Sequence, residues 1–297
     1  MNEVAIVVVT YNRKELLKEN LIALTQQEYK DFHIYVIDNA STDGTREYIE
    51  EFINLENISY YNTGKNIGGA GGFNYGLKKA SEQKRYKYCW AMDDDTIPTK
   101  DALKSLIEKA NLLNRDFSFL CSVVKFNENE LCNMNIPTIH NDWLKSYENI
   151  ENKLVRVESC SFVSCFMNME YVYKIGLPIK EFFIYGDDVE YTLRLSKENK
   201  AFIDLGSIVV HKMKSNATAN AINIEKERMN RIFYTYRNRF YIYKKQSIKS
   251  TIRFILHYII TIIKVLIKSK NHKLRRIAIM TKGMICGIFF NPKIEKA

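Results

Sequence analysis

Acidic residues are absent from a long stretch near the end of the chain, between Glu227 and Glu295. Of the 44 Lys and Arg residues, 16 lie in that stretch, which leaves 28 basic against 34 acidic residues elsewhere. The formal net charge of +10 therefore describes a basic tail on an acidic body. Such asymmetry predicts a polyanionic partner, either a membrane surface or a nucleic acid.

Other missing patterns exclude several classes of protein. The six cysteines form no Cys-x-x-Cys pair and the histidines lack zinc-site spacing, so we expect reduced, mostly buried cytosolic thiols. A signal peptide is not predicted, because Glu3 stands where basic residues are needed and the first apolar run is short. A hydrophobic content of 46% with 12% aromatic residues excludes a disordered chain.

The glycine-rich stretch at residues 64–72 matches neither common phosphate-binding motif. It is not a Walker A sequence, and Asn74 stands where a Gly-x-Gly-x-x-Gly motif needs its last glycine. Five glycines within nine residues suit a flexible turn with tight helix packing, and they equally suit close approach of the backbone to a ligand. Both interpretations stay open at this point.

Strand and helix patterns alternate through the first part of the chain. Strands are predicted at residues 3–9, 32–38, 58–62, 86–92 and 117–126, and the intervening helices end near residues 27, 53, 80 and 113. This order predicts an α/β fold, a mostly parallel, doubly wound sheet that binds ligands at the carboxyl ends of its strands. Further on, we expect a variable polar loop over 127–153, a strand over 157–169, a helix from 187 and a short strand over 208–211.

Three consecutive carboxylates, Asp93, Asp94 and Asp95, follow the strand at 86–92. Alternation along a strand would direct Asp93 and Asp95 to one side and Asp94 to the other. One acid is enough for a helix N-cap, whereas two carboxylates on one side need a positive charge, usually a divalent cation. We therefore predict a metal site, although not an EF-hand loop, whose glycine and distant glutamate are missing.

A second acidic cluster, Asp187, Asp188 and Glu190, opens the helix predicted from residue 187. Such acids could serve only the helix macrodipole. The aromatic approach at residues 182–185 favours instead a partly desolvated carboxylate with a raised pKa, suited to act as a base. His211 ends the short strand, and because a lone histidine is more often structural, its role depends on the other sites.

Six motifs, taken in their order and spacing, resemble family 2 glycosyltransferases of the GT-A fold, and within them the galactofuranosyltransferase and rhamnosyltransferase-like group. The resemblance runs from about residue 3 to about residue 240. The motifs are Val9-Thr-Tyr-Asn-Arg13, Ile37-Asp-Asn-Ala-Ser-Thr-Asp-Gly-Thr45, Asn66-Ile-Gly-Gly-Ala-Gly-Gly-Phe73, Met92-Asp-Asp-Asp95, Gly186-Asp-Asp-Val-Glu-Tyr-Thr-Leu-Arg194 and Tyr236-Arg-Asn-Arg239.

This resemblance implies a role for each candidate residue. Asp188 would be the catalytic base with Asp187 as its neighbour, and His211 would complete the metal site. Asp93 and Asp95 would contact the metal and diphosphate, and Asp94 the ribose or sugar. The nucleotide-sugar would be held by Thr10, Tyr11, Asn12, Arg13 and Asp38, which would read the base edge, and by Asn66, Gly68 and Gly69.

The chemistry implied is a single inverting displacement by a metal-dependent glycosyltransferase. Mg²⁺ or Mn²⁺ would neutralise the leaving diphosphate, and a carboxylate would take the proton of the acceptor hydroxyl. Asp oxygens suit both ions, and an imidazole favours Mn²⁺ somewhat. The best match for the donor is UDP-galactofuranose, with dTDP-rhamnose as the alternative, and the acceptor would be a glycan or lipid-linked glycan in cell-surface polysaccharide synthesis.

The basic tail is interpreted as a separate region. We divide the chain into a GT-A domain, residues 1–224, and an amphipathic helical region, residues 225–297. The apolar run at 254–267 is too short to span a bilayer, so a helix on an anionic membrane surface is predicted, peripheral on the inner face of the cell membrane with a cytoplasmic body. Packing on the core or in a homo-oligomer is the alternative. Arg237 and Arg239 could bind phosphate or belong to the tail.

Two other functional classes remain. A nucleotidyltransferase would want a glycine-rich, basic first loop, and residues 10–14 contain no glycine. A non-catalytic RNA-binding protein would use the tail, but the tail lacks nucleic-acid motifs and is very apolar, so we expect no nucleic-acid partner.

Overall fold

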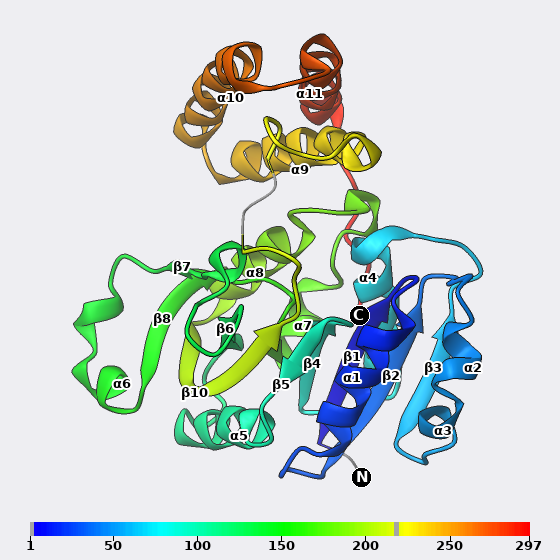
Figure 1. The fold of residues 1–297 in the computed structure, drawn as a ribbon. Helices are drawn as coiled ribbons and strands as arrows, with labels where there is room; N and C mark the ends of the chain where they lie inside the picture. The colour runs from blue at the N-terminus through cyan, green and yellow to red at the C-terminus, as the bar shows by residue number, and fades with distance from the viewer. Residues whose placement is uncertain (1–2, 217–219) are drawn as a thin grey trace.

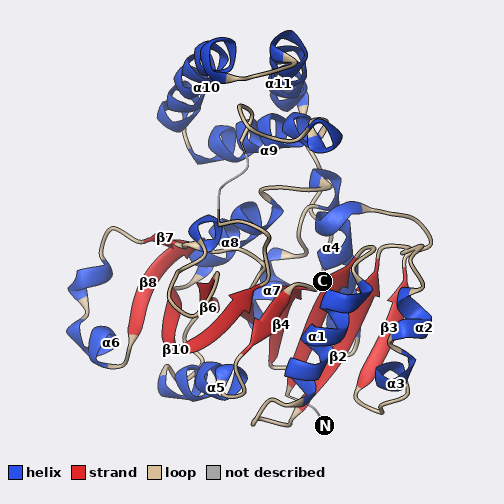
Figure 2. Cartoon of the chain, viewed as in Figure 1, coloured by secondary structure: helices blue, strands red, loops and turns tan. Residues whose placement is uncertain are grey.

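The computed structural model describes residues 3–216 and 220–297. Within these ranges the core is a ten-stranded mixed sheet with the strand order β3-β2-β1-β4-β9-β6-β10-β8-β7, and β5 pairs with β10 off this path. Helices cover both faces of the sheet, and a group of three helices stands over one of its edges (Figure 1, Figure 2). The α/β class predicted from the sequence is confirmed.

The N-terminal half of the sheet is parallel, as predicted. It contains β1 (Val4–Thr10), β2 (Phe32–Asp38), β3 (Ile58–Asn62) and β4 (Tyr88–Asp93). Every residue of β1 is buried, as expected for a parallel strand covered on both faces. The covering helices here are α1 (Lys14–Thr25), α2 (Thr45–Tyr48), α3 (Glu50–Ile53), α4 (Gly68–Glu82) and α5 (Ala102–Leu112).

The C-terminal half is mixed and differs from the expectation in two places. The single strand expected at 157–169 is wrong: β8 (Leu154–Ser159) pairs with β10 (Ala201–His211), whereas β9 (Cys165–Asn168) lies between β4 and β6 (Phe119–Lys125). The strand expected at 208–211 begins seven residues earlier, at Ala201. Short elements complete this half, namely β5 (Thr96–Pro98), β7 (Thr138–Ile139), α6 (Tyr147–Glu151), α7 (Met169–Ile175) and α8 (Asp187–Glu198).

The early part of β10 escapes sequence patterning because it contains a bulge. The register against β6 shifts between Asp204 and Ile208. The carboxylate of Asp204, although fully buried, accepts hydrogen bonds from Ser105 Oγ at 2.6 Å and from the Gly206 amide at 2.9 Å. A polar residue paired in this way is tolerated inside a sheet, so a segment that looks like a turn continues the strand.

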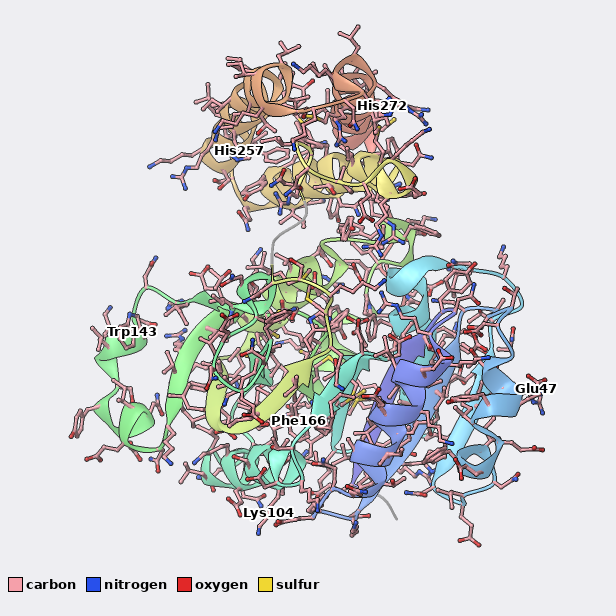
Figure 3. The ribbon with its side chains drawn as sticks, in the orientation of Figure 1. Glu47, Lys104, Trp143, Phe166, His257 and His272 are labelled. Carbon is pink, nitrogen blue, oxygen red and sulfur yellow. The ribbon has the colours of Figure 1, made fainter. Side chains whose placement is uncertain are left out.

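Apolar side chains fill the space on both faces of the sheet. One cluster gathers around Trp90 and Phe166 (labelled in Figure 3), and the other around Phe119 and Tyr191. The six cysteines are free thiols, five of them buried and Cys286 half-buried, which confirms the expectation of reduced thiols.

The last three helices form a unit with an apolar cluster of its own. Helices α9 (Arg231–Gln246), α10 (Ile248–Lys268) and α11 (Lys273–Phe289) pack together, and buried Arg276 donates hydrogen bonds to the carbonyls of Ala221 and Ile224 in the segment that leads into them. This group, from here on the helical unit, lies above α8 and the start of α4 in Figure 1.

Helix α10 corrects the estimate of its length. The apolar run expected at 254–267 is part of a helix of 21 residues, because the helix begins at Ile248 and ends at Lys268. Among the described residues it is the one helix long and apolar enough to cross a membrane by length and composition. The prediction that this segment is too short to span a bilayer is therefore wrong.

The chain returns from the helical unit to the core after α11. The Leu177 amide donates to the carbonyl of Glu295 at 2.8 Å, and Lys180 Nζ lies 2.5 Å from the Glu295 carboxylate. Gly176 has φ +80°, and a Cβ there would lie 2.3 Å from the same carbonyl. Residues 290–297 thus form a strap that fastens the helical unit to the core a second time.

Candidate active site

Strand register brings the candidate residues to one edge of the sheet. Thr10 stands opposite Asp38, and Val9 opposite Asp93, so β1, β2 and β4 all end at the same level. The loops that follow these strands carry most of the predicted nucleotide-binding residues. The sheet edge is therefore the place where the first, second and fourth motifs meet.

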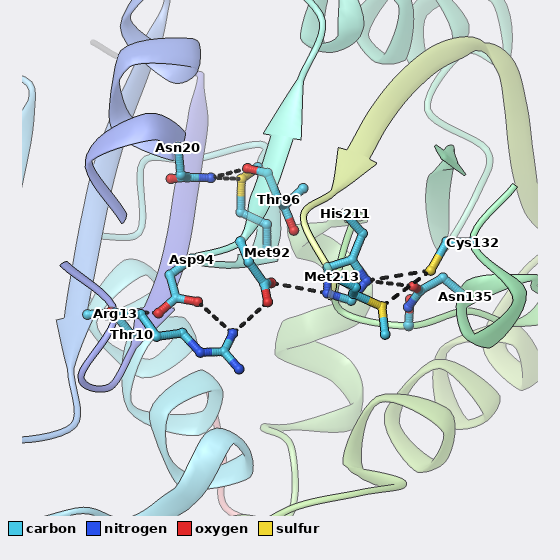
Figure 4. Close-up of polar contacts among 12 residues, drawn as sticks. Thr10, Arg13, Asn20, Met92, Asp94, Thr96, Cys132, Asn135, His211 and Met213 are labelled. Carbon is cyan, nitrogen blue, oxygen red and sulfur yellow. Dashed lines mark hydrogen bonds and ion pairs between the residues drawn. The ribbon is translucent and has the colours of Figure 1, made fainter. Parts of the chain in front are cut away.

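The aspartate triplet is held by contacts to the loop after β1. Thr10 Oγ1 donates to Asp94 Oδ2 at 2.7 Å, and Arg13 Nη1 lies 3.2 Å from Asp94 Oδ1 and 2.5 Å from Asp95 Oδ2 (Figure 4). Because β4 ends at Asp93, the next two residues form a turn and share one guanidinium group. The alternation that separated Asp94 from Asp95 is thus wrong beyond Asp93.

His211 meets the triplet from β10. Its Nε2 lies 3.1 Å from Asp95 Oδ1, and its Nδ1 lies 2.8 Å from Asn135 Oδ1 and 3.7 Å from Cys132 Sγ. Asn135 and Cys132 come from the loop expected to be variable, and no motif in the sequence marks them. A proton on Nδ1, shared with Asn135, leaves Nε2 free as an acceptor or metal ligand.

Burial controls the charge of the triplet. It raises the pKa of Asp93 to about 8, with a further contribution from the negative charge of Asp95. Burial also raises the pKa of Asp94 to about 6, in spite of Arg13. Burial acts in the same direction on Asp95, but its hydrogen bond to His211 and the charges of His211 and Arg13 outweigh this and leave its pKa below the usual value.

The donor set fits a divalent cation in its chemistry. Within the described ranges, no three Asp, Glu, His or Cys side chains are grouped so as to hold a metal ion, and the positive charge beside Asp94 and Asp95 comes from Arg13 and His211. Asp93 is nevertheless a buried carboxylate whose raised pKa reflects missing positive charge. Carboxylate oxygens with one imidazole are ligands that Mg²⁺ or Mn²⁺ accepts.

Asp38 lies at the end of β2 beside a cavity of 290 Å³. Its Oδ1 accepts a hydrogen bond from the Ser41 amide at 2.8 Å, and its Oδ2 accepts one from the Tyr60 hydroxyl. The neighbouring loop is tied to it, because Asn12 Oδ1 accepts from the Thr42 amide at 2.7 Å. Tyr11 is 42% exposed at this edge. The structure therefore brings Thr10, Tyr11, Asn12, Arg13 and Asp38 into one neighbourhood.

The glycine stretch serves two structural purposes. Gly68 has φ +76° and begins α4, and a Cβ there would lie 2.1 Å from the carbonyl oxygen of Phe183. Gly72 allows α4 to approach β1, since its Cβ would lie 2.5 Å from Val9. Gly69, in contrast, faces open space. Asn66 caps the turn by accepting from the Gly68 amide at 2.8 Å, and it lines a larger cavity of 690 Å³ beside α4, separate from the cavity at Asp38.

The carboxylates of α8 lie at the other side of Gly68. Burial raises the pKa of Asp187 to about 8, with a contribution from Asp188, and burial also raises the pKa of Asp188. The raised pKa expected from the aromatic approach is thereby confirmed. Glu190 has a structural partner in Arg194 at 2.8 Å.

Two further expectations are resolved by contacts. Arg237 is engaged by carbonyl groups, with Nη2 2.6 Å from the oxygen of Glu181, so the phosphate-binding alternative is not supported for this residue. Trp143 lies at the outer edge of the sheet beyond β8 (Figure 3), whereas Cys132 and Asn135 of the same polar stretch reach His211. The stretch at 127–153 is thus part site and part surface.

This architecture, with carboxylates at the ends of a mostly parallel sheet, defines a GT-A nucleotide-sugar transferase fold. Solved structures agree on the fold. GalNAc-T7 with UDP, GalNAc and Mn²⁺ has a TM-score of 0.63 at 14% identity, over 82% of this chain and 48% of that one. The mannosyltransferase PcManGT from Pyrobaculum calidifontis, in complex with GDP-Man and Mn²⁺, has a TM-score of 0.57 at 13% identity, over 97% and 76%.

The particular family follows from the sequence, which matches Glycosyl transferase family 2 over residues 5–176, more than half of the chain. The protein belongs to this family, as the motifs predicted. Among its relatives are abequosyltransferase RfbV of Salmonella typhimurium, 39% identical over 33% of this chain and 29% of that protein, and galactofuranosyltransferase GlfT1 of Mycolicibacterium smegmatis, 34% identical over 35% and 33%. The chain thus matches about a third of the length of these relatives.

Proposed function

We propose that this glycosyltransferase moves a sugar from a nucleoside diphosphate sugar to a hydroxyl of a glycan or lipid-linked glycan, with inversion at the anomeric carbon. The observation that carries the proposal is the position of Gly68. Its carbonyl accepts from Asn39 Nδ2 at 3.1 Å at the end of β2, and its Cα touches the loop that leads to α8. One residue therefore joins the nucleotide-binding edge to the carboxylates of raised pKa.

In the proposed reaction, Asp38 and the loop at residues 10–13 bind the nucleotide. Asp93, Asp95 and His211 would hold Mg²⁺ or Mn²⁺, which supplies charge neutralisation of the diphosphate when bound. Asp188 takes the proton of the acceptor hydroxyl as the oxygen attacks the anomeric carbon, and the bond to the diphosphate breaks on the opposite side. Asp187, next to it in the same buried setting, keeps one proton shared between the pair.

Nucleotide binding is tested by thermal stabilisation with UDP, dTDP and GDP, each with and without Mn²⁺. Ligand at 100 times its Kd stabilises by about 2.7 kcal/mol. A Mn²⁺-dependent shift with UDP, absent in Asp93→Ala, is expected for a UDP-sugar donor, with galactofuranose as the first sugar to test. A larger shift with dTDP would favour rhamnose, and no shift with any nucleotide would refute the donor site.

Turnover is tested with Asp188→Asn, which should reduce transfer about 10²- to 10⁴-fold while UDP still binds. Glu198→Gln, at the other end of α8 and paired with Lys174, is the matched control and should keep its activity. Equal transfer by Asp188→Asn and the wild type would exclude Asp188 as the base.

We also propose that α10 docks on an anionic lipid surface at the inner face of the cell membrane. Its basic residues Lys249, Arg253, Lys264 and Lys268 are exposed along the whole helix, and so are its apolar residues, which include Ile252, Leu256, Ile259, Ile263 and Ile267. Each basic residue close to such a surface contributes about 1 kcal/mol. Basic residues spread over the full length favour a helix lying on the bilayer over one that crosses it.

Co-sedimentation with vesicles tests this docking. Vesicles with phosphatidylglycerol should bind the protein and pure phosphatidylcholine vesicles should not, and the double change Ile259→Glu with Ile263→Glu should abolish binding. Equal binding to both vesicles, unchanged by salt, would point to a bilayer-spanning helix. Binding to neither, together with a dimer that the double change dissociates, would make α10 a subunit contact.

A further inference from the structure

The loop before α8 has an uncommon backbone. Phe183 and Tyr185 have φ values of +63° and +68°, and Gly186, which precedes α8, has φ +85°. Residues with side chains rarely adopt positive φ, and they keep it only where neighbouring groups enforce it. The conformation of this loop sets where α8, and with it Asp187 and Asp188, begins.

One side chain of the helical unit enforces this conformation. Asn238, fully buried on α9, directs Nδ2 at three carbonyl oxygens of the loop, those of Phe182 at 3.0 Å, Ile184 at 3.0 Å and Tyr185 at 2.8 Å. An amide group has two hydrogens to donate, so the three acceptors share them. These contacts bracket both residues of positive φ.

The orientation of the Asn238 amide is itself determined by Arg237. Arg237 Nε donates to Asn238 Oδ1 at 2.9 Å, which turns the amide nitrogen toward the loop. The same guanidinium donates to the carbonyls of Glu181 and Phe182, and it lies over the ring of Phe290 with 4.2 Å between Cζ and the ring centroid. Every donor contact here goes to the protein backbone or to Asn238 and none to the triplet.

The far side of the loop reaches the donor pocket. The carbonyl of Phe183 accepts from the Ala70 amide at 3.2 Å and lies against Gly68 at the start of α4. A loop fixed by Asn238 therefore determines two distances at once, from the α8 carboxylates to the glycine turn and from both to the sheet edge. A reacting group misplaced by about 1 Å can cost about a hundredfold in rate.

We propose that Asn238 is a positioning residue for sugar transfer: its amide holds the Glu181–Gly186 loop so that the carboxylate of Asp188 stands ready for the acceptor hydroxyl. This inference rests on the proposed role of Asp188 as the base. It assigns to the helical unit a part in the reaction besides surface docking, and it accounts for the Tyr236-Arg-Asn-Arg239 motif, which neither nucleotide nor metal binding uses.

The test compares Asn238→Asp and Asn238→Ala with the wild type. Asn238→Asp keeps the shape but replaces the donating amide with an acceptor, so kcat should fall about a hundredfold while the affinity for UDP, measured by calorimetry with Mn²⁺, stays within about threefold. Hydrogen exchange should speed up at the amides of residues 183–189 in both variants. The control is Thr281→Val, which removes the hydrogen bond between Thr281 and Tyr258 inside the helical unit and should change neither kcat nor loop exchange.

The outcomes separate this inference from the proposed function. Wild-type kcat in Asn238→Asp, or a loss of kcat matched by an equal loss of UDP affinity, would overturn the positioning role. If Asp188→Asn is fully active, the proposed base is wrong. Loop exchange in Asn238→Asp then still decides whether Asn238 holds the loop, because that measurement needs no activity. Unchanged exchange would overturn the inference.

Discussion

Replacing Asp187 with Asn should make the protein more stable, and increasingly so as the pH rises. Burial, helped by the charge of Asp188, raises the pKa of Asp187 from 3.8 to about 8 in the folded state. Between these two values the folded protein binds more protons than the unfolded chain, so the wild type loses stability as the pH rises through this window. Asparagine resembles the protonated form and removes this dependence.

The size of the effect follows from the width of the window. One proton contributes at most about 1.4 kcal/mol per pH unit. Because Asp187 and Asp188 titrate as a pair, the gain of Asp187→Asn over the wild type should reach roughly 2–4 kcal/mol between pH 5 and pH 8. For a chain of this size each kcal/mol corresponds to about 2–4 °C in Tm.

Thermal or urea unfolding at pH 5, 6, 7 and 8 measures this difference. Asp31→Asn, at an exposed position, controls for the change in net charge. The wild type also contains Asp93 and Asp94, whose raised pKa values act in the same direction, so only the difference between variant and wild type isolates Asp187. A difference that is constant from pH 5 to pH 8 would refute the argument from burial.

Three further predictions concern other parts of the site. Gly68→Ala should lower the free energy of unfolding by about 2 kcal/mol or more, because its Cβ would meet the Phe183 carbonyl, whereas Gly69→Ala, in open space, should not; urea unfolding compares them. Asn135→Ala should raise the Mn²⁺ concentration needed for UDP stabilisation about 10- to 100-fold, since it orients His211; equal titrations would oppose this. The transfer rate should rise with pH from 5 to 9, because Asp188, whose pKa burial raises, must lose its proton; a flat profile would contradict it.

Features determined by local chemistry could be predicted from the sequence. The run from Val4 to Thr10 predicts a buried parallel strand, since it is continuously apolar. The triplet at Asp93 and the acids at Asp187 stand at strand and helix ends, where fixed polar groups gather in such sheets. The aromatic residues before α8 correctly indicated carboxylates of raised pKa.

Features that depend on long-range partners could not be predicted. Asn135 is one of many asparagines in a polar stretch, and only the fold places it 2.8 Å from His211. The bulge at Asp204 conceals most of β10, because Ser105, which makes that buried acid tolerable, lies 99 residues away. Asn238 belonged to a noted motif, but its partners are backbone carbonyls, which leave no trace in a sequence.

The strap at residues 290–297 turns the helical unit from a hinged arm into a frame with two fixing points. The unit joins the core through the chain that leads into α9 and again where Glu295 meets Leu177 and Lys180. If α10 rests on lipid, such a frame leaves the core free to rotate only about the membrane normal, so the active site stays at a constant height above the bilayer. That height would then act as a ruler: the length of a lipid-linked acceptor, more than its sugar sequence, would decide which hydroxyl reaches the base.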